Sequence, residues 1–187
     1  MMGFRTTTAW SAALLAMTTV AASVAGHAKA DGATTRQESA SELTGATKLV
    51  GVRKVLTAYE VIRGQLARDE VGAVEASARE LRKVAEMVSA GAPAPLRKHL
   101  IRVASTARRL SALGSADAGA VRKAFGETSR HIVALLVAEP ALRKGLNIFR
   151  CPMAQGYKKW VQPEGKLANP YMGAKMLRCG SASDWQA

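Results

Sequence analysis

Four stretches of apolar residues, spaced three or four apart, constrain the fold of this chain more than any other feature. Such spacing places apolar side chains on one face of an α-helix, and residues 91–95 and 114–117 break the pattern between stretches. An isolated amphipathic helix of this length is only marginally stable in water, so the four apolar faces must bury one another. The sequence therefore predicts an all-α fold, an antiparallel four-helix bundle over residues 46–140. The predicted inward-facing positions are Leu49, Val52, Leu56, Tyr59, Ile62 and Leu66; Val71, Val74, Ala78, Leu81, Ala85 and Val88; Leu96, Leu100, Val103, Ala107 and Leu110; and Val121, Phe125, Thr128, Ile132 and Leu135.

The composition supports helices and excludes several classes of function. Apolar residues make up 48% of the chain but aromatic residues only 5%, which favours helices over a β-sandwich. Lys and Arg number 27 against 14 Asp and Glu, a formal net charge of +13. Basic helix faces attract an anionic membrane surface or an acidic protein. The sequence has no nucleic-acid-binding motif, glycine-rich phosphate loop, nucleophile elbow or carboxylate pair, so we expect neither an enzyme nor a nucleic-acid-binding protein.

The N-terminal residues have the features of an export signal. Arg5 precedes an uncharged, apolar stretch over residues 10–26, and an AKA sequence with the A-x-A form of a signal-peptidase site follows. We therefore expect residues 1–30 to be a signal peptide with cleavage after Ala30, and the single Arg indicates the general secretory route to the periplasm. Residues 31–45 have no apolar period and are rich in small polar residues, so we assign them to a flexible leader.

Residues 141–187 form a Cys- and Met-rich C-terminal segment that we expect to pack on the bundle. Residues 146–149 are a candidate short strand. Asn169 followed by Pro170 is typical of a helix start, because Asn caps the first turn and Pro needs no N–H there. The segment is therefore predicted as a loop or short hairpin followed by a short helix over residues 170–179.

Five sulfur-bearing residues in this segment form a candidate metal site. On the predicted helix, Met172, Met176 and Cys179 are spaced four and three apart and share one face, while Cys151 and Met153 lie upstream beside a proline. Thiolate and thioether sulfurs are soft ligands that suit Cu(I) or Ag(I). Zn(II) prefers Cys and His at spacings not found in this sequence, and Ca(II) or Mg(II) needs clustered carboxylates. The sequence therefore offers Cys151, Met153, Met172, Met176 and Cys179 as ligands of a soft metal ion.

A disulfide between Cys151 and Cys179 is the alternative interpretation of the same residues. Two cysteines in an exported protein usually pair, and methionines four apart on a helix usually pack in a core. The bridge closes a loop of 29 residues and contributes about 3.6 kcal/mol in the chain-entropy model. It also removes both thiolates as ligands, so no metal is expected if it forms. His99 and His131 flank the apolar stripes, and we interpret them as half-buried or solvated side chains.

The motif CPMA at residues 151–154, Trp160 and the sequence NPYMGAKMLRCG at residues 169–180 resemble the C-terminal signature of a periplasmic family, domain of unknown function 3347. Members of that family occur as small exported proteins and as extensions of the adaptor proteins of heavy-metal efflux pumps. The resemblance runs from about Lys48 to Gly180, over most of the chain. It implies a stand-alone periplasmic protein linked to copper, silver or related metals.

The sequence leaves two functions open. The first is an exported periplasmic protein that binds or delivers Cu(I) or Ag(I) in heavy-metal efflux or homeostasis. The second is a non-catalytic helical interaction module with a structural disulfide between Cys151 and Cys179, which binds an envelope or efflux partner. The positions of the sulfur atoms distinguish these two functions: Met153 and Met176 sulfurs far from both cysteines would favour the second.

Overall fold

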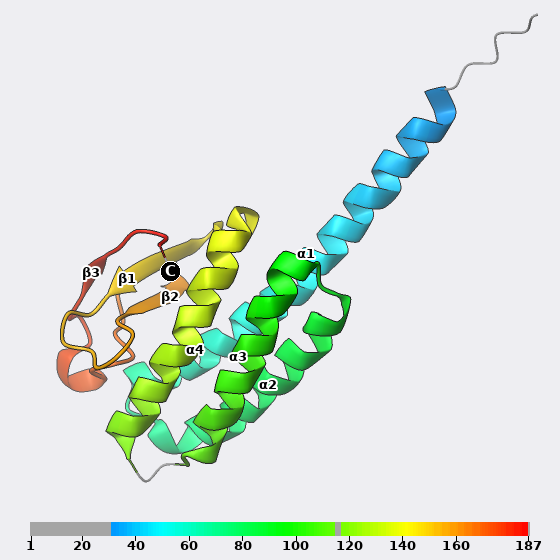
Figure 1. Ribbon diagram of the computed structural model, residues 1–187. Helices are drawn as coiled ribbons and strands as arrows, with labels where there is room; N and C mark the ends of the chain where they lie inside the picture. Colours follow the sequence, from blue (N-terminus) through cyan, green and yellow to red (C-terminus); the bar gives the residue numbers. More distant parts are fainter. Residues whose placement is uncertain (1–30, 115–116, 187) are drawn as a thin grey trace, which may run out of the picture.

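The computed structural model describes residues 31–114 and 117–186 of the chain. Four helices follow one another and pack in chain order, each against the next, as Figure 1 shows. They are α1 (Asp31–Ala67), α2 (Val74–Gly91), α3 (Ala94–Ala112) and α4 (Ala118–Ala138), with a short 3-10 turn η1 (Val71–Ala73) before α2. The predicted four-helix bundle is therefore confirmed.

The core of the bundle consists of the apolar stripes that the sequence predicts. In α3, Leu100, Val103 and Leu110 are completely buried, and the corresponding positions of the other helices face them. Residues near the ends of the stripes, such as Leu49 and Val88, are only partly buried. Because burial of a large aliphatic side chain contributes about 1.5–3 kcal/mol, these layers account for most of the stabilising free energy of the bundle.

Helix α1 begins at Asp31, so residues 31–45, which the sequence assigns to a leader, have helical backbone. At 1.5 Å per residue its 37 residues span about 55 Å, and its first half extends beyond the other helices in Figure 1. This half has no regular apolar face, so its sequence lacks the periodicity that predicts a helix. The predicted signal peptide, residues 1–30, lies outside the described residues. Over residues 31–114 and 117–186, no helix has both the length and the apolar character needed to cross a membrane.

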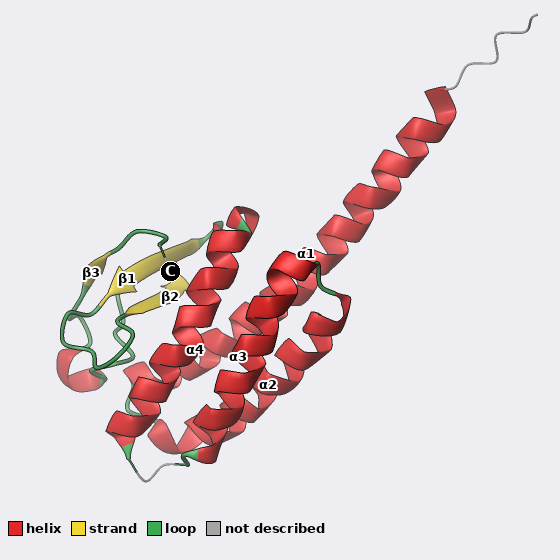
Figure 2. Cartoon of the chain, in the orientation of Figure 1, coloured by secondary structure: helices red, strands yellow, loops and turns green. Residues whose placement is uncertain are grey.

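A small antiparallel sheet in the C-terminal segment packs beside α4, as Figure 2 shows. Its strand order is β2-β1-β3, and Phe149 of the central strand pairs with Trp160 on one side and Ala182 on the other. The predicted strand at residues 146–149 is confirmed as β1. The elements of the segment are η2 (Pro140–Arg143), β1 (Leu146–Arg150), β2 (Lys159–Pro163), η3 (Ala174–Met176) and β3 (Ser181–Ala182).

The α-helix predicted over residues 170–179 is wrong, because only one 3-10 turn, η3, forms there. Asn169 does cap the segment: its Oδ1 accepts hydrogen bonds from the N–H groups of Tyr171 at 2.7 Å and Met172 at 3.2 Å. Gly173 then adopts φ 62° and ψ −157°, which ends any continuing helix. A Cβ at Gly173 would collide with the carboxylate of Asp69, so this turn requires glycine.

Strand β2 lies against α4 and α1, and side-chain hydroxyls cover its outer edge. The N–H of Val161 donates to Tyr59 Oη at 3.4 Å. Ser129 Oγ and Tyr171 Oη both donate to the carbonyl of Lys159, at 2.9 Å and 2.7 Å. These hydroxyl groups satisfy backbone groups that an edge strand otherwise leaves open, and they fasten the C-terminal segment to the bundle.

Candidate cysteine and methionine site

The two cysteines lie side by side at the end of the β1–β3 pair. Cys151 directly follows β1, and one residue, Gly180, separates Cys179 from β3. Arg150 pairs with Ser181 in the antiparallel register, so the next position places Cys151 opposite Gly180. The thiol of Cys179 thereby comes within hydrogen-bonding reach of Cys151, and both cysteines are free. The fold thus brings together two thiols that are 28 residues apart in the chain.

Hydrogen bonds to the backbone hold both cysteines in place. Cys151 is completely buried, and its N–H donates to the carbonyl of Lys158 at 2.9 Å. Cys179 is half-buried, and its N–H donates to the carbonyl of Met176 at 2.9 Å. The carbonyl of Cys179 also accepts a hydrogen bond from the side-chain amide of Asn169, which is completely buried. The thiol pair is therefore positioned before any ion binds.

Gly180 allows the chain to pass close to β1 beside the thiol pair. Its φ is 144°, and a Cβ there would lie 2.8 Å from the ring of Trp160 and 3.1 Å from the carbonyl oxygen of Arg150. Carbon atoms do not approach this closely, so the position requires glycine. The Trp160 indole consequently packs against the backbone that follows Cys179.

Burial raises the pKa of the Cys179 thiol above its ordinary value, and the neighbouring Cys151 raises it further through charge repulsion and a thiol hydrogen bond. Each of these effects disfavours the thiolate form. The proton therefore stays on Cys179 at neutral pH, and a bound cation has to displace it. It follows that any affinity of this pair for a metal ion increases with pH.

Two of the methionines share a different part of the surface. Met153 and Met172 line a groove of about 200 Å³ together with Arg122 and Lys123 of α4, and neither cysteine lines this groove. Met153 is 58% exposed, so its thioether is accessible to solvent. Met176 lies in η3 and is half-buried. The structure thus groups the two cysteines, groups Met153 with Met172 elsewhere, and ties Met176 to Cys179 through one backbone hydrogen bond.

The thiol pair is a small ligand set. Within residues 31–114 and 117–186, no three His, Cys, Asp or Glu side chains gather where they could hold a metal ion together. A structural Zn(II) site takes four such ligands, whereas soft ions such as Cu(I) accept few ligands and select sulfur. The same juxtaposition also suits a disulfide, because Cys151 comes opposite Gly180, the residue next to Cys179, just beyond the paired ends of β1 and β3.

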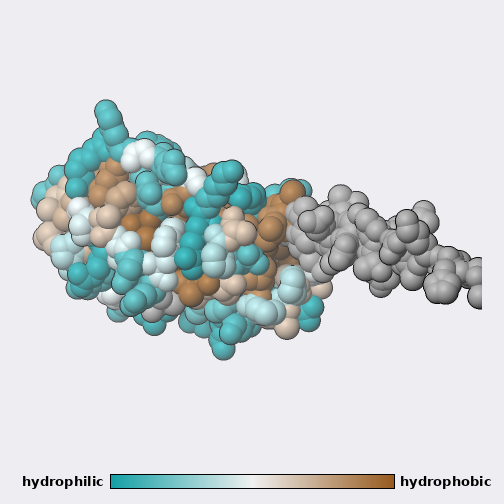
Figure 3. All heavy atoms as spheres, turned by 90° about the horizontal axis from the view of Figure 1, so that it is seen from above, coloured by the Kyte–Doolittle hydropathy of each residue, from teal (hydrophilic) through white to brown (hydrophobic). Residues whose placement is uncertain are grey.

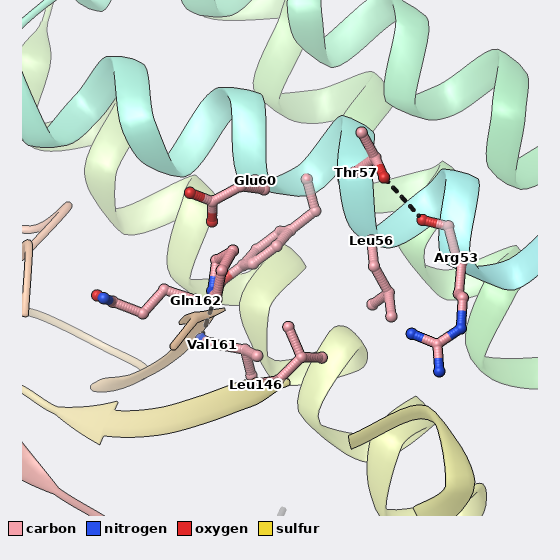
Figure 4. A pocket seen from close by; sticks show the side chains of 9 residues that line it. Arg53, Leu56, Thr57, Glu60, Leu146, Val161 and Gln162 are labelled. Atoms are coloured by element: carbon pink, nitrogen blue, oxygen red, sulfur yellow. Dashed lines mark hydrogen bonds between the residues drawn. The ribbon is translucent and has the colours of Figure 1, made fainter. Parts of the chain in front are cut away.

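A pocket of about 330 Å³ between α1 and β2 was not predicted from the sequence. Figure 4 shows Arg53 and Glu60 on either side of it. Glu60 accepts two 2.7 Å hydrogen bonds from the guanidinium of Arg63, which compensates its charge. The apolar period of α1 shows which face turns inward, but no sequence signal shows that β2 comes to lie beside that face. The apolar wall of the pocket consists of Leu56, Tyr59, Leu146 and Val161.

Exposed basic side chains gather on α3, a helix that contains no Asp or Glu. Ile101, which lies among them, is 52% exposed. Figure 3 shows one face of the molecule, on which hydrophilic residues are interspersed with apolar ones. The positive charge of α3 attracts anionic surfaces. The exposed bases of this helix are Arg97, Lys98, Arg102, Arg108 and Arg109.

Comparison of the chain with protein-family models, curated proteins and solved structures finds no match. The relation to domain of unknown function 3347 therefore stays a prediction from the motifs at residues 151–180.

Proposed function

We propose that this protein is exported to the periplasm and binds or delivers a soft monovalent metal ion, Cu(I) or Ag(I), in heavy-metal homeostasis. The observation that carries the proposal is the juxtaposition of two free thiols, Cys151 and Cys179, at the end of paired strands. Export is supported by the signal-peptide features of residues 1–30, and the link to efflux by the motifs of residues 151–180. In this proposal the protein binds its cargo and catalyses no reaction.

The chemistry of the pair favours a soft ion over other cations. Two thiolates supply two negative charges, which overcompensate one monovalent ion and bind it through polarizable sulfur. Hard cations need oxygen ligands, and the C-terminal segment has only Glu164 and Asp184. Asp184 is already bound by Lys159 Nζ at 2.8 Å. The thiol pair is therefore the ligand set around which we place the metal ion.

The methionines have auxiliary roles in this proposal. Met176 is three residues from Cys179 and bonded to it through the backbone, which makes its thioether the first candidate for a third ligand. Met153 and Met172 share their groove with Arg122 and Lys123, whose positive charges disfavour a bound cation. We assign these two methionines to weak, transient contact with the ion during its transfer.

Competition for Cu(I) tests the proposal. Reduced protein is dialysed against a Cu(I) chelator, and the copper that remains bound is measured. We expect the wild type to retain copper and the Cys151→Ser and Cys179→Ser variants to lose it. Met87→Leu is the control, because this methionine of α2 is 74% exposed and lies outside the C-terminal segment. Reduced wild-type protein that retains no copper contradicts the proposal.

The second candidate function is a non-catalytic interaction module whose C-terminal segment is stapled by a disulfide. It is favoured by the same adjacent thiols and by the exposed basic residues of α3, which suit an acidic envelope or efflux protein or an anionic membrane surface. A count of free thiols separates the two candidates. Protein purified from the periplasm without reductant is alkylated, and its intact mass is measured by mass spectrometry. A mass two hydrogen atoms below that of the reduced chain, without alkylation, supports the disulfide. Two alkylated thiols support the metal site.

A further inference from the structure

His99 of α3 and His131 of α4 lie at the same level of the bundle. His99 is 13 residues before the end of its helix at Ala112, and His131 is 13 residues after the start of its helix at Ala118. The two helices are packed neighbours separated by five residues of sequence, and each histidine lies about 20 Å along its helix from the helix end nearest this connection. Because the helices run in opposite directions, this equal spacing places the two histidines at the same level of the bundle, on neighbouring helices.

Both imidazoles border the seam between α3 and α4. Each histidine is half-buried, and the residue that follows each one is completely buried in the core. Among the charged and titratable groups that act on His131, His99 has the largest influence, ahead of Arg102, Glu127 and Arg130. This influence agrees with the helix register, because it requires the two imidazoles to lie within electrostatic range of each other across the seam.

The surroundings keep both imidazoles in the form that binds metals. Burial lowers the pKa of His99 and of His131. Lys98 lowers the pKa of His99 further, and His99, Arg102 and Arg130 lower that of His131, whereas Glu127 raises it. The positive charges of Lys98, Arg102 and Arg130 also oppose a bound cation, so the affinity of such a site depends on the two ring nitrogens. Neutral imidazole therefore dominates at neutral pH. Its unprotonated ring nitrogen is a ligand for borderline divalent ions such as Cu(II), Ni(II) and Zn(II).

We infer that His99 and His131 form a bidentate site for a divalent transition-metal ion, such as Ni(II) or Cu(II), across the α3–α4 seam. In the described part of the chain no third His, Cys, Asp or Glu side chain joins them, so water completes the coordination shell. Figure 1 shows α3 and the sheet that carries the cysteines on opposite sides of α4. The inferred site is therefore separate from the thiol pair and does not depend on the function proposed for it.

Calorimetric titration of the protein with Ni(II) tests this site. We expect His99→Gln and His131→Gln each to weaken Ni(II) binding at least tenfold. The double variant is expected to bind only slightly more weakly than either single variant, because most of the affinity comes from chelation by both rings. Lys98→Gln is the matched control: it lies next to His99 but is exposed, and loss of its positive charge leaves binding at wild-type strength or tighter. Equal affinity in the wild type and either histidine variant overturns the inference.

A Cys151→Ser/Cys179→Ser variant separates the two proposed sites. It should lose Cu(I) and keep wild-type affinity for Ni(II), whereas loss of Ni(II) binding with both histidines present overturns the inference.

Thermal melting gives a second readout, because an ion that binds only the folded state raises the melting temperature. A rise with Ni(II) in the wild type that is absent in both histidine variants, with unchanged circular dichroism spectra, supports the site. A rise of equal size in all of these proteins contradicts it.

Discussion

At the scale of single residues, Asn169 shows how one buried side chain positions a candidate ligand. Its Oδ1 accepts hydrogen bonds from the N–H groups of Tyr171 and Met172, and its amide nitrogen donates to the carbonyl of Cys179. Its own N–H donates to the carbonyl of Leu177 at 2.8 Å. Replacement of this buried side-chain amide is costly, because its three backbone partners, at Tyr171, Met172 and Cys179, lose their hydrogen bonds at once.

Replacement of Asn169 tests this role. We expect Asn169→Ala to lower the free energy of unfolding by about 3 kcal/mol, because several buried polar groups lose their partners. We also expect faster alkylation of Cys179, since its backbone anchor is gone. Urea denaturation and the alkylation rate are the two measurements. Asn147→Ala, at an exposed position of β1, should leave both near wild type. An Asn169→Ala protein with wild-type stability and alkylation rate would show that the amide does not hold this turn.

The pH dependence of alkylation tests the coupling between the two thiols. Thiolate is the reactive form, so the rate rises with pH through the pKa of Cys179, which we expect above the ordinary value of 9.0. Cys151→Ser removes the charge repulsion and the thiol hydrogen bond, so the midpoint should move to lower pH while the effect of burial remains. A midpoint that is the same with and without Cys151 would mean that the thiols do not interact.

At the scale of elements, the approach of the C-terminal segment to α4 depends on a glycine. Gly126 lies inside α4, where glycine normally costs about 0.5–1 kcal/mol relative to alanine. A Cβ at this position would lie 2.9 Å from the carbonyl oxygen of Tyr157 in the chain that leads to β2. The helix therefore carries a residue of poor helix propensity because the neighbouring backbone occupies the space of a side chain.

Two glycine substitutions distinguish this contact from helix propensity. We expect Gly126→Ala to lower the free energy of unfolding by about 1–2 kcal/mol, because overpacking outweighs the gain in propensity. Gly64→Ala in α1 should raise it by about 0.5–1 kcal/mol, because the nearest group, 3.2 Å away, is the movable end of the Arg68 side chain. Thermal denaturation of both variants measures the difference. Stabilisation by Gly126→Ala would contradict the close approach.

At the scale of the whole molecule, the C-terminal segment is fastened to both ends of the helical sequence. Arg63 of α1 donates to the carbonyl of Ala168 at 2.7 Å, and Arg122 of α4 donates to that of Pro170 at 3.1 Å. Stacking adds to these bonds: Phe125 of α4 lies 5.2 Å from the ring of Tyr59 and 5.8 Å from that of Tyr171. A covalent link within this segment therefore constrains a part of the chain that folds together with the bundle.

Oxidation of the thiol pair tests this coupling. A disulfide between Cys151 and Cys179 closes a loop of 29 residues and should raise the free energy of unfolding by about 3.6 kcal/mol. Urea denaturation of oxidised and reduced protein measures the change. The Cys151→Ser/Cys179→Ser variant should respond to neither oxidant nor reductant. If oxidation leaves the wild-type midpoint unchanged, the segment does not unfold in the same transition as the helices.

Local patterns account for the parts of the structure that the sequence predicts correctly. The burial of Leu100, Val103 and Leu110 is predictable, because their helical spacing and apolar character suffice to place these side chains on one buried face. The capping hydrogen bonds of Asn169 are predictable too, because the N–H groups that it accepts from lie only two and three positions further along the chain. The helix expected to follow Asn169 does not form because Gly173, at φ 62°, packs closely against the carboxylate of Asp69, a residue of the α1–α2 connection.

The sequence by itself determined four packed amphipathic helices, a strand at residues 146–149 and a C-terminal segment that concentrates sulfur, because these depend on periodicity, turn residues and composition. Only the tertiary structure decided that Cys151 lies within hydrogen-bonding reach of Cys179 and that Met153 and Met172 line a different part of the surface. It also decided that His99 and His131 lie at the same level of two neighbouring helices. The physical reason is that strand register and helix pairing are set by contacts between distant segments. A one-dimensional pattern contains the residues that make such contacts but not the distances between them.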